Sequence, residues 1–338
     1  MINFQYARAS DVADAVRQIA ADPAAKFIAG GTNLIDLMKE DVERPSQLID
    51  ISRLPLRTVE QTEGGGLKIG ALVPNSDLAY HPLIAQRYPM VASAVLAGAS
   101  AQLRNMASTG GNLLQRTRCA YFYDTATPCN KREPGSGCSA ITGLNRMHAI
   151  LGASEACIAT HPSDMCVALV ALDAKVHVAG PAGERSIAFA DFHRLPENTP
   201  QRDTNLEPNE IVTAVELPAR GFATNYTYLK IRDRLSYAFA LVSVAAALEL
   251  EGSTIKEARL ALGGVAHKPW RDLSVEASLR GQTAKREAFM GAADALLRDA
   301  KGRAHNAFKI DLARRAVVRA LTQAARGTPQ SQSSKKVR

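Results

Sequence analysis

The spacing of apolar residues divides the first part of the chain into short helices and strands. A helix is predicted after Asp11, whose side chain suits an N-cap, and Asp22-Pro23 ends it. The residues at helical spacing between these two points are Val12, Ala15, Val16 and Ile19. The elements predicted next are a buried strand at 26–29, a helix over 33–39, and strands at 47–51 and 67–72.

Regular spacing stops and then returns in the middle of the chain. An alanine-rich helix is predicted over 90–103, but from about 115 to 156 the periodicity largely disappears. So long a stretch without regular structure inside a compact domain is usually functional or disordered. At His161-Pro162-Ser163-Asp164 a new helix opens, capped by Ser163 or Asp164, and strands follow near 175–178 and 211–217.

A domain boundary is predicted around residues 218–225, where the chain crosses Pro218 and Gly221. The segments predicted beyond it are three strands at 226–231, 240–250 and 257–262, and two or three amphipathic helices that include 312–325. This pattern indicates a small α+β domain. Residues 327–338 have the composition of a disordered basic tail.

Composition and charge exclude several classes of protein. The 338 residues are 46% hydrophobic and 22% charged, which is typical of a globular protein. The net charge is +8, but ten Lys and Arg against one acid lie from Lys301 onward, so the remaining chain is near −1. This distribution indicates a solvated basic surface, or secondarily a subunit contact, and no nucleic-acid motif is present. No run approaches the roughly 20 apolar residues that span a bilayer, so membrane insertion is not expected.

Four of the five cysteines fall within the irregular stretch. Cys119, Cys129, Cys138 and Cys157 are spaced C-x9-C-x8-C-x18-C among turn-forming residues. Four thiolates that converge suit an iron–sulfur cluster or a structural zinc ion, and the missing C-x2-C pairs favour iron–sulfur. Two disulfides or four unrelated thiols are the alternatives. Cys166 lies in an apolar helix and is expected to be a core residue.

Two glycine turns suggest a phosphate-binding site. Gly30-Gly31-Thr32-Asn33 lies between a strand and a helix, where glycine lets backbone N–H groups approach a phosphate. The second turn, Ser108-Thr109-Gly110-Gly111-Asn112, has the same chemistry. Together they favour a dinucleotide, although two tight turns without a ligand are the alternative, and no Rossmann fingerprint is present.

Two further residues are candidates for cofactor contacts. Asp164 suits a cofactor hydroxyl, or else it only caps its helix. Lys230 lies in a strand and suits a flavin or phosphate, whereas an edge-strand lysine in solvent is the ordinary alternative. The seven histidines show no metal-ligand spacing, and no catalytic acid or base is identified.

Several segments resemble, in order, the FAD-binding subunit of the molybdenum hydroxylases, the xanthine dehydrogenase family. They are FIAGGTNLIDLMK, ASAQLRNMASTGGNLLQRTRC, HPSDMCVALVALDA, KIRDRLSYAFALVSVAAALEL and LALGGVAHKPWR. The resemblance covers about residues 1–325. It implies an α+β fold with a two-lobed FAD-binding domain over 1–220, not a Rossmann fold, and a small sheet-plus-helices C-terminal flavoprotein domain over 221–326. The lobes would span about 1–60 and 61–220, with the cysteine-rich loop at 115–158.

The cysteine-rich stretch resembles the flavin subunit of bacterial periplasmic aldehyde oxidoreductases, which carries a [4Fe-4S] cluster besides FAD. The resemblance therefore implies an iron–sulfur cluster rather than zinc, with Cys119, Cys129, Cys138 and Cys157 as ligands. The residues that it implies for FAD are Lys26, Phe27, Ile28, Ala29, Gly30, Gly31, Thr32, Asn33 and Leu34 in the first loop, Ser108, Thr109, Gly110, Gly111 and Asn112 in the second, and Asp164 and Lys230.

The function implied by the resemblance is electron transfer within a heterotrimer. A large subunit with a molybdenum cofactor would oxidise an aldehyde to a carboxylic acid, and a small subunit with [2Fe-2S] clusters would pass electrons to FAD here and on to an external acceptor. Because the N-terminus shows no export pattern, periplasmic location would depend on a partner with a twin-arginine signal, and the cytoplasm is the alternative. The functional alternatives are a purine, carbon monoxide or aryl-CoA hydroxylase, or a zinc-stapled assembly subunit without a redox role.

Overall fold

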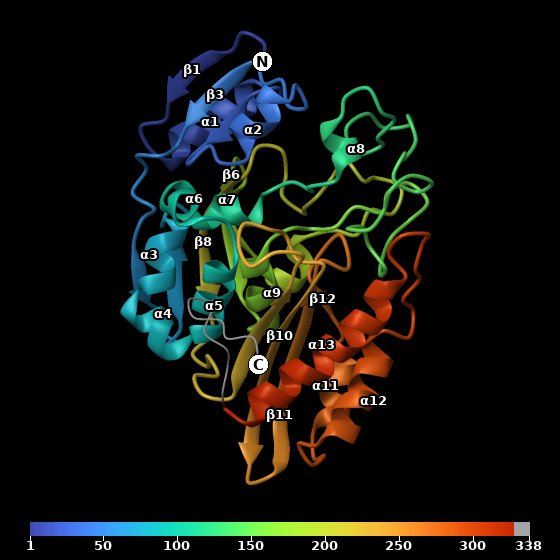
Figure 1. The fold of residues 1–338 in the computed structure, drawn as a ribbon. Coiled ribbons are helices and arrows are strands. Elements are labelled where there is room, and N and C mark those ends of the chain that lie inside the picture. The colour runs from blue at the N-terminus through green and yellow to red at the C-terminus, as the bar shows by residue number, and fades with distance from the viewer. Residues whose placement is uncertain (328–338) are drawn as a thin grey trace.

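Three separate β-sheets organise the chain, and the computed structural model describes residues 1–327 (Figure 1). The tail expected at 327–338 lies outside the described residues, apart from Gly327. Within residues 1–327, no helix is both long enough and apolar enough to cross a membrane. The sheets follow one another down the long axis of the molecule, with the N-terminal sheet at one end.

The N-terminal sheet is parallel, with strand order β1-β3-β2. Parallel neighbours need crossover connections, and here these are supplied by two helices. The elements are β1 (Gln5–Arg8), α1 (Val12–Ala21), β2 (Lys26–Ile28), α2 (Leu34–Lys39) and β3 (Gln47–Asp50). The predicted helix after Asp11 is confirmed, because the Asp11 carboxylate accepts a hydrogen bond from the Asp14 N–H at 2.7 Å.

The central sheet has five antiparallel strands in the order β4-β5-β8-β6-β7. Its strands are β4 (Val59–Gln61), β5 (Leu67–Gly70), β6 (Lys175–Gly180), β7 (Gly183–Ala188) and β8 (Ile211–Leu217). The helices of this part are α3 (Asn75–Tyr80), α4 (Pro82–Arg87), α5 (Pro89–Ala97), α6 (Ala101–Met106), α7 (Thr109–Leu113), α8 (Ala120–Tyr123), α9 (Asp164–Ala171) and α10 (Phe189–Phe192). One apolar core joins this sheet to α5 and α9.

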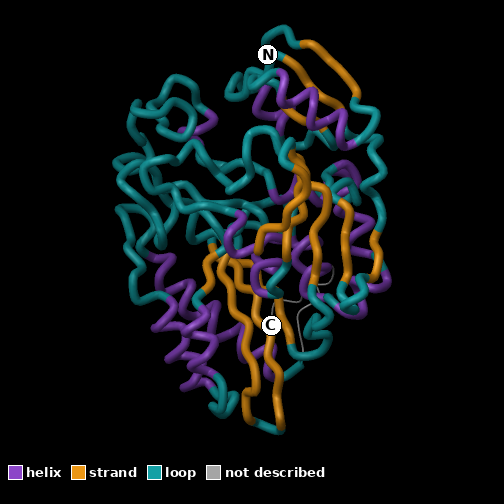
Figure 2. The backbone as a smooth tube through the Cα atoms, turned by 180° about the vertical axis from the view of Figure 1, so that it is seen from behind, coloured by secondary structure: helices purple, strands orange, loops and turns teal. Residues whose placement is uncertain are grey.

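The C-terminal sheet is antiparallel, with strand order β12-β11-β10-β9, and three helices cover one of its faces (Figures 1 and 2). The elements are β9 (Tyr226–Ile231), β10 (Val242–Glu251), β11 (Thr254–Gly263), β12 (Trp270–Arg271), α11 (Leu273–Leu279), α12 (Arg286–Leu296) and α13 (Phe308–Ala325). A second core fills the space between these strands and helices. Because α9 packs on β10 and β11, the central and C-terminal parts of the chain are in direct contact.

Two local predictions are wrong. The helix predicted over 90–103 is divided into α5 and α6, because Ala99 adopts a φ of +51° and the Ser100 side chain caps α6. The second glycine turn is instead the short helix α7, whose N-cap Ser108 accepts a hydrogen bond from the Gly111 N–H at 3.2 Å. In both places a serine side chain satisfies a helix N–H group and starts a new helix.

Candidate functional site

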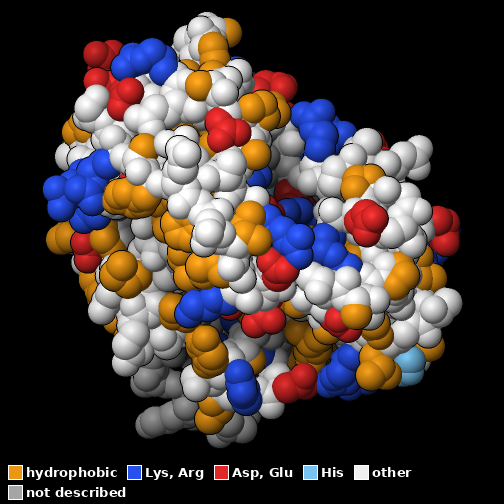
Figure 3. All heavy atoms as spheres, turned by 90° about the horizontal axis from the view of Figure 1, so that it is seen from above, with side chains coloured by type: hydrophobic (Ala, Val, Ile, Leu, Met, Phe, Trp, Pro, Cys, Tyr) orange, Lys and Arg blue, Asp and Glu red, His pale blue; other side chains and the backbone are white. Residues whose placement is uncertain are grey.

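A single cavity of about 1200 Å³ brings the two glycine segments together. All nine residues from Lys26 to Leu34 line it, as do Asp164 and Lys230. From the second segment, Ser108, Gly110, Gly111 and Asn112 line it. Figure 3 looks onto this end of the molecule and shows a hollow where Lys and Arg side chains gather beside Asp and Glu. The volume suits a ligand larger than most drug-sized molecules.

The first glycine segment presents free backbone donors. Among the described residues, the N–H groups of Gly31, Thr32 and Asn33 have no acceptor, whereas the Ile35 N–H already bonds to the Gly31 carbonyl at 3.1 Å. Gly31 has a φ of +71°, a conformation that other residues rarely adopt. A Cβ atom on Gly30 would lie 1.8 Å from the Met106 carbonyl oxygen. The segment therefore needs both glycines to expose these donors to a phosphate.

The second segment uses most of its donors within the protein. The Thr109 N–H and hydroxyl both donate to the Val73 carbonyl at 2.9 Å, and the Gly110 N–H donates to the Ala71 carbonyl at 2.8 Å. Thr109 is buried and does not line the cavity, unlike its neighbours. This segment therefore contributes a tightly packed part of the cavity wall. A Cβ atom on Gly110 would lie 3.0 Å from the Ala71 Cβ.

Asp164 and Lys230 form a buried ion pair at the inner wall of the cavity. The Lys230 ammonium lies 2.7 Å from one Asp164 carboxylate oxygen, and the side chains are 1% and 8% exposed. The Tyr228 hydroxyl donates to the other oxygen at 2.7 Å. Ser163, not Asp164, caps α9, since its hydroxyl oxygen accepts from the Cys166 N–H. Lys230 lies on the edge strand β9 but is buried, unlike the solvent-facing lysine typical of such strands.

The cavity rim carries cations that favour an anionic ligand. Lys26, Arg104 and Arg202 line the cavity, and none has a carboxylate within 4.0 Å in the described residues. Arg116, in contrast, is neutralised by Glu43 at 2.6 Å and Asp203 at 2.8 Å. Unpaired guanidinium and ammonium groups bind phosphate strongly when partly desolvated.

The four cysteines of the irregular stretch line one small cavity next to the large one. Cys119, Cys129, Cys138 and Cys157 all contribute to its wall. Cys129 and Cys138 face each other in an isolated antiparallel bridge. All five cysteines of the chain are free, so the disulfide alternative has no support in this arrangement. Cys119 also lines the large cavity, so its side chain lies in the wall between the two.

One asparagine organises the backbone around the cysteine cavity. The Asn130 side-chain oxygen accepts hydrogen bonds from the Gly135 N–H at 3.1 Å and the Gly137 N–H at 2.8 Å. Its amide nitrogen donates to the Ala156 carbonyl at 2.9 Å, which holds the segment before Cys157. The two glycines have φ values of +90° and +105°. Side-chain hydrogen bonds thus replace the missing helix or sheet and hold the cysteine-bearing segments together.

The electrostatics of the cysteines reflect their mutual contact. A hydrogen bond between Cys138 and Cys157 lowers the pKa of Cys138 to about 6 and raises the pKa of Cys157. Burial raises the pKa of Cys119 to about 11.

The four loop cysteines are not arranged as closely as the ligands of a single metal ion. In the described chain, three possible ligand atoms lie within 4.8 Å of one another only at His161, Cys166 and His193. Four thiolates around one zinc ion would lie about 3.8 Å apart, given a Zn–S distance of about 2.3 Å.

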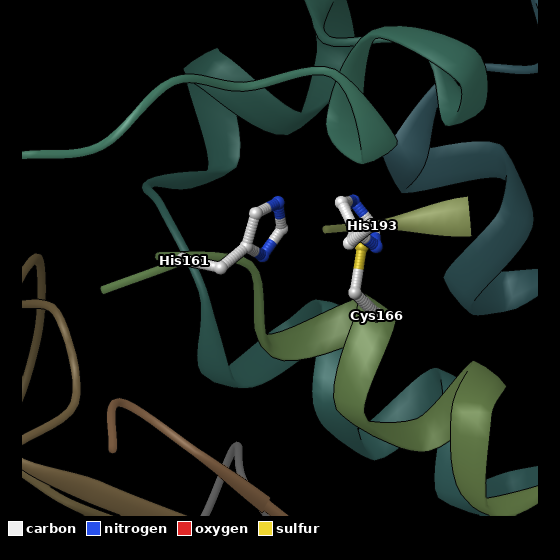
Figure 4. A group of neighbouring side chains, drawn as sticks. All are labelled: His161, Cys166 and His193. Atoms are coloured by element: carbon white, nitrogen blue, oxygen red, sulfur yellow. The ribbon is translucent and has the colours of Figure 1, made fainter. Parts of the chain in front are cut away.

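The half-buried His161, which lines the cavity, forms a compact group with the buried Cys166 and His193 (Figure 4). Cys166 points from α9 toward His193, and the ring centroids of His161 and His193 are 4.2 Å apart. The His193 Nε2 bonds to the Leu113 carbonyl at 2.9 Å, and burial lowers the pKa of His193 to about 4, so the ring is neutral. Cys166 is fully buried in the apolar core, which confirms the sequence prediction.

Sequence reasoning missed the residues that support the cysteine loop. His148 contacts Cys119, with its Nε2 3.1 Å from the sulfur, although no histidine showed ligand spacing. Lys309 is fully buried and donates to the His148 carbonyl at 2.8 Å. A signal for Lys309 was present, because it lies on the apolar stripe of its helix, at helical spacing from Ala313, Ala316 and Val317. A lysine in such a stripe indicates a buried partner.

Two family profiles match consecutive parts of the chain. The FAD-binding domain in molybdopterin dehydrogenase matches residues 2–220, and the carbon monoxide dehydrogenase flavoprotein C-terminal domain matches residues 226–324.

Individual proteins are similar over nearly the whole chain. The aldehyde oxidoreductase FAD-binding subunit PaoB of Escherichia coli (strain K12) is 52% identical and is aligned over 95% of this chain and 98% of its own length. The glyceraldehyde dehydrogenase medium chain of Sulfolobus acidocaldarius is 30% identical over 82% of each chain. Among solved structures, carbon monoxide dehydrogenase from Hydrogenophaga pseudoflava matches with a TM-score of 0.76 and 26% identity over 97% of this chain and 100% of the other.

Removing the cation of the buried pair should destabilise the chain strongly. Lys230→Met leaves the Asp164 carboxylate buried without a counter-charge, so we expect the free energy of unfolding to fall by about 3–5 kcal/mol. Denaturant unfolding of the full chain measures this loss. Asp164→Leu combined with Lys230→Met should recover part of it, since no unpaired charge remains. The control is Lys256→Met, which breaks the exposed pair with Glu251 and should cost less than about 1 kcal/mol. Equal losses for Lys230→Met and Lys256→Met would contradict the prediction.

A methyl group on Gly30 should disturb the phosphate-facing loop. In Gly30→Ala the new Cβ meets the Met106 carbonyl, so the loop has to move away from α6 and its free N–H groups with it. We expect the FAD-to-protein ratio of the purified variant, read from the flavin absorption, to fall well below that of the natural chain. Gly291→Ala is the matched control, because Gly291 is an exposed helix position with nothing within 4 Å of the added atom. Full FAD occupancy in Gly30→Ala would show that the loop tolerates the shift.

Proposed function

Because the chain belongs to the FAD-binding subunits of the molybdenum hydroxylases, we propose that it is the electron-transfer subunit of an aldehyde oxidoreductase and holds a [4Fe-4S] cluster in addition to FAD. The observation that carries the aldehyde assignment is the 52% identity to an aldehyde oxidoreductase FAD-binding subunit across almost the full length of both chains. The convergence of four cysteines on one cavity supports the cluster.

The large cavity has the donor set that FAD requires. The free N–H groups of Gly31, Thr32 and Asn33, with the unpaired Lys26 and Arg104 nearby, suit the pyrophosphate. When bound, FAD supplies the electron-accepting and electron-donating chemistry, and the protein supplies binding, orientation and electrostatics. The buried Asp164–Lys230 pair keeps the inner wall polar but leaves no charge without a partner. The wall residues thus orient the cofactor and exclude water, and the cavity needs no acid or base from this chain to transfer electrons.

The cysteine cavity has the donor set that an iron–sulfur cluster requires. Cys119, Cys129, Cys138 and Cys157 would supply four thiolates, which is the usual complement for a [4Fe-4S] cluster. In the described residues, no three of these sulfurs lie within 4.8 Å of one another. Four thiolates bound to one zinc ion would lie closer together than this, so the spacing favours a cluster. The Lys131 side chain also lines this cavity, where its buried ammonium bonds to the Pro200 carbonyl at 2.6 Å and pairs with the Asp203 carboxylate at 2.5 Å.

We propose that two partner subunits complete the electron path. A large subunit would carry the molybdenum cofactor and oxidise the aldehyde, and a small subunit would carry [2Fe-2S] clusters that deliver electrons to FAD here, before an external acceptor takes them. Two relatives are named as the medium chains of their enzymes, which supports a complex with a larger and a smaller partner subunit. We further propose co-export to the periplasm with a partner that has a twin-arginine signal. Fractionation of cells that make all three subunits, with detection of this chain in the cytoplasm alone, would argue against that location.

Activity of the assembled complex tests the substrate class. With aromatic aldehydes as substrate and an artificial acceptor, we expect turnover to the carboxylic acid, and little or no turnover of xanthine or carbon monoxide. The comparison is needed because proteins with those other activities share this subunit type. Preferential oxidation of xanthine or carbon monoxide would place the enzyme with those hydroxylases instead.

Loss of one cluster ligand should remove iron selectively. In Cys129→Ser we expect the iron bound to this subunit to be lost and the 119–157 loop to become sensitive to proteolysis, since the cluster cross-links it. Iron analysis of the complex, with the partner's [2Fe-2S] clusters as internal reference, measures the loss. Cys166→Ala is the control and should keep all iron, because Cys166 lies in the apolar core. Unchanged iron in Cys129→Ser would contradict the ligand assignment. A natural chain that is colourless and contains stoichiometric zinc would support the zinc-stapled alternative.

A further inference from the structure

One imidazole lies directly against a cysteine of the candidate cluster site. The Nε2 atom of His148 is 3.1 Å from the Cys119 sulfur, and the side chain is buried. Its Nδ1 has no hydrogen-bond partner in the described part of the chain. With a thiolate at Cys119, the ring hydrogen therefore belongs on Nε2, where it points at the sulfur.

The backbone of His148 is fixed from several sides, so this contact is built into the fold. The His148 N–H donates to the Asn145 carbonyl at 3.0 Å. The His148 carbonyl accepts from Lys309 Nζ at 2.8 Å and from the Asn306 amide at 3.3 Å. Lys309 belongs to α13 and Asn306 to the segment just before it, so the start of α13 holds the backbone of His148 in place. Because the backbone is fixed and the ring is buried, little conformational freedom is lost in placing the ring nitrogen against the sulfur.

The contact lies where the two cavities meet. His148 and Cys119 both line the large cavity, and Cys119 also lines the cysteine cavity. Of the four cysteines, Cys119 alone contributes to both walls among the described residues. A hydrogen bond to this sulfur therefore acts on the cysteine that faces the large cavity.

We propose that His148 is a positioning residue that raises the reduction potential of the [4Fe-4S] cluster through an Nε2–H···Sγ hydrogen bond to Cys119. This inference rests on the cluster proposed above. Adding one electron to a cluster with four thiolate ligands adds one negative charge, and the N–H dipole stabilises that charge more in the reduced state than in the oxidised state. Burial strengthens the effect, because little water competes for the sulfur.

The experiment is a redox titration of the assembled heterotrimer, with reduction by dithionite and detection of the reduced [4Fe-4S] signal by low-temperature EPR. His148→Phe keeps a ring of similar size without the donor, and we expect its midpoint potential to shift to a more negative value. His148→Gln places an amide N–H near the position of Nε2 and should stay close to the natural protein. His148→Asn has a donor too short to reach the sulfur and should behave like His148→Phe. His177→Gln is the control, because His177 pairs with Glu216 in the central sheet, and it should leave the potential unchanged.

The outcomes separate this inference from the function on which it rests. If the natural complex shows neither a [4Fe-4S] signal nor the corresponding iron, the proposed cluster is overturned, and the role of His148 with it. A full cluster whose potential is the same in His148→Phe and the natural protein overturns the role of His148 alone. If His148→Phe does not retain its cluster, the natural complex labelled with ¹⁵N-histidine decides. Pulsed EPR should then detect one histidine nitrogen coupled to the reduced cluster, and absence of that coupling overturns the proposal.

Discussion

The buried carboxylate of Asp164 joins the central part of the chain to the C-terminal sheet. It lies at the first turn of α9, and its two oxygens accept from Lys230 and Tyr228 on β9. A carboxylate and an ammonium are both costly to bury alone, so each requires the other at this position. The pair therefore fixes the C-terminal sheet against the central part, and with it the inner wall of the large cavity. The packing of α9 on β10 and β11 and the ion pairs of Arg259 and Arg271 with Asp173 strengthen the same junction.

The cysteine-bearing stretch obtains its shape in a different way. Apart from α8 it has no regular structure, and its backbone groups are satisfied by side chains such as Asn130, within the stretch, and Lys309, on α13. Buried polar groups must be paired, and here the pairing itself determines where the four thiols point. The same contacts bring His148 to Cys119. One hydrogen-bond network thus supports the cysteine-bearing stretch and places His148 beside Cys119.

The groups that line the large cavity in the described residues suit the binding of an anionic cofactor. The cavity offers free N–H groups, unpaired cations and a paired inner wall, all of which bind and orient an anionic cofactor. Two histidines line the cavity, the buried His148 and the half-buried His161, and burial lowers the pKa of His161 well below its usual value, so that ring is neutral at physiological pH. This arrangement fits the proposed electron-transfer role.

The sequence by itself determined most of the local structure, because hydrophobic periodicity and capping residues act over a few neighbours. The strands predicted at 211–217 and 226–231 agree with β8 and β9, and the Asp11 cap is confirmed. The order of the motifs also indicated the family. What only the tertiary structure decided concerns contacts between residues far apart in the chain: the pairing of Asp164 with Lys230, the burial of Lys309, and the contact of His148 with Cys119. Such contacts depend on how the sheets pack, and no local pattern encodes that. For the same reason the second glycine segment was expected as a turn, whereas Ser108 and its neighbours close it into α7 with its donors already used.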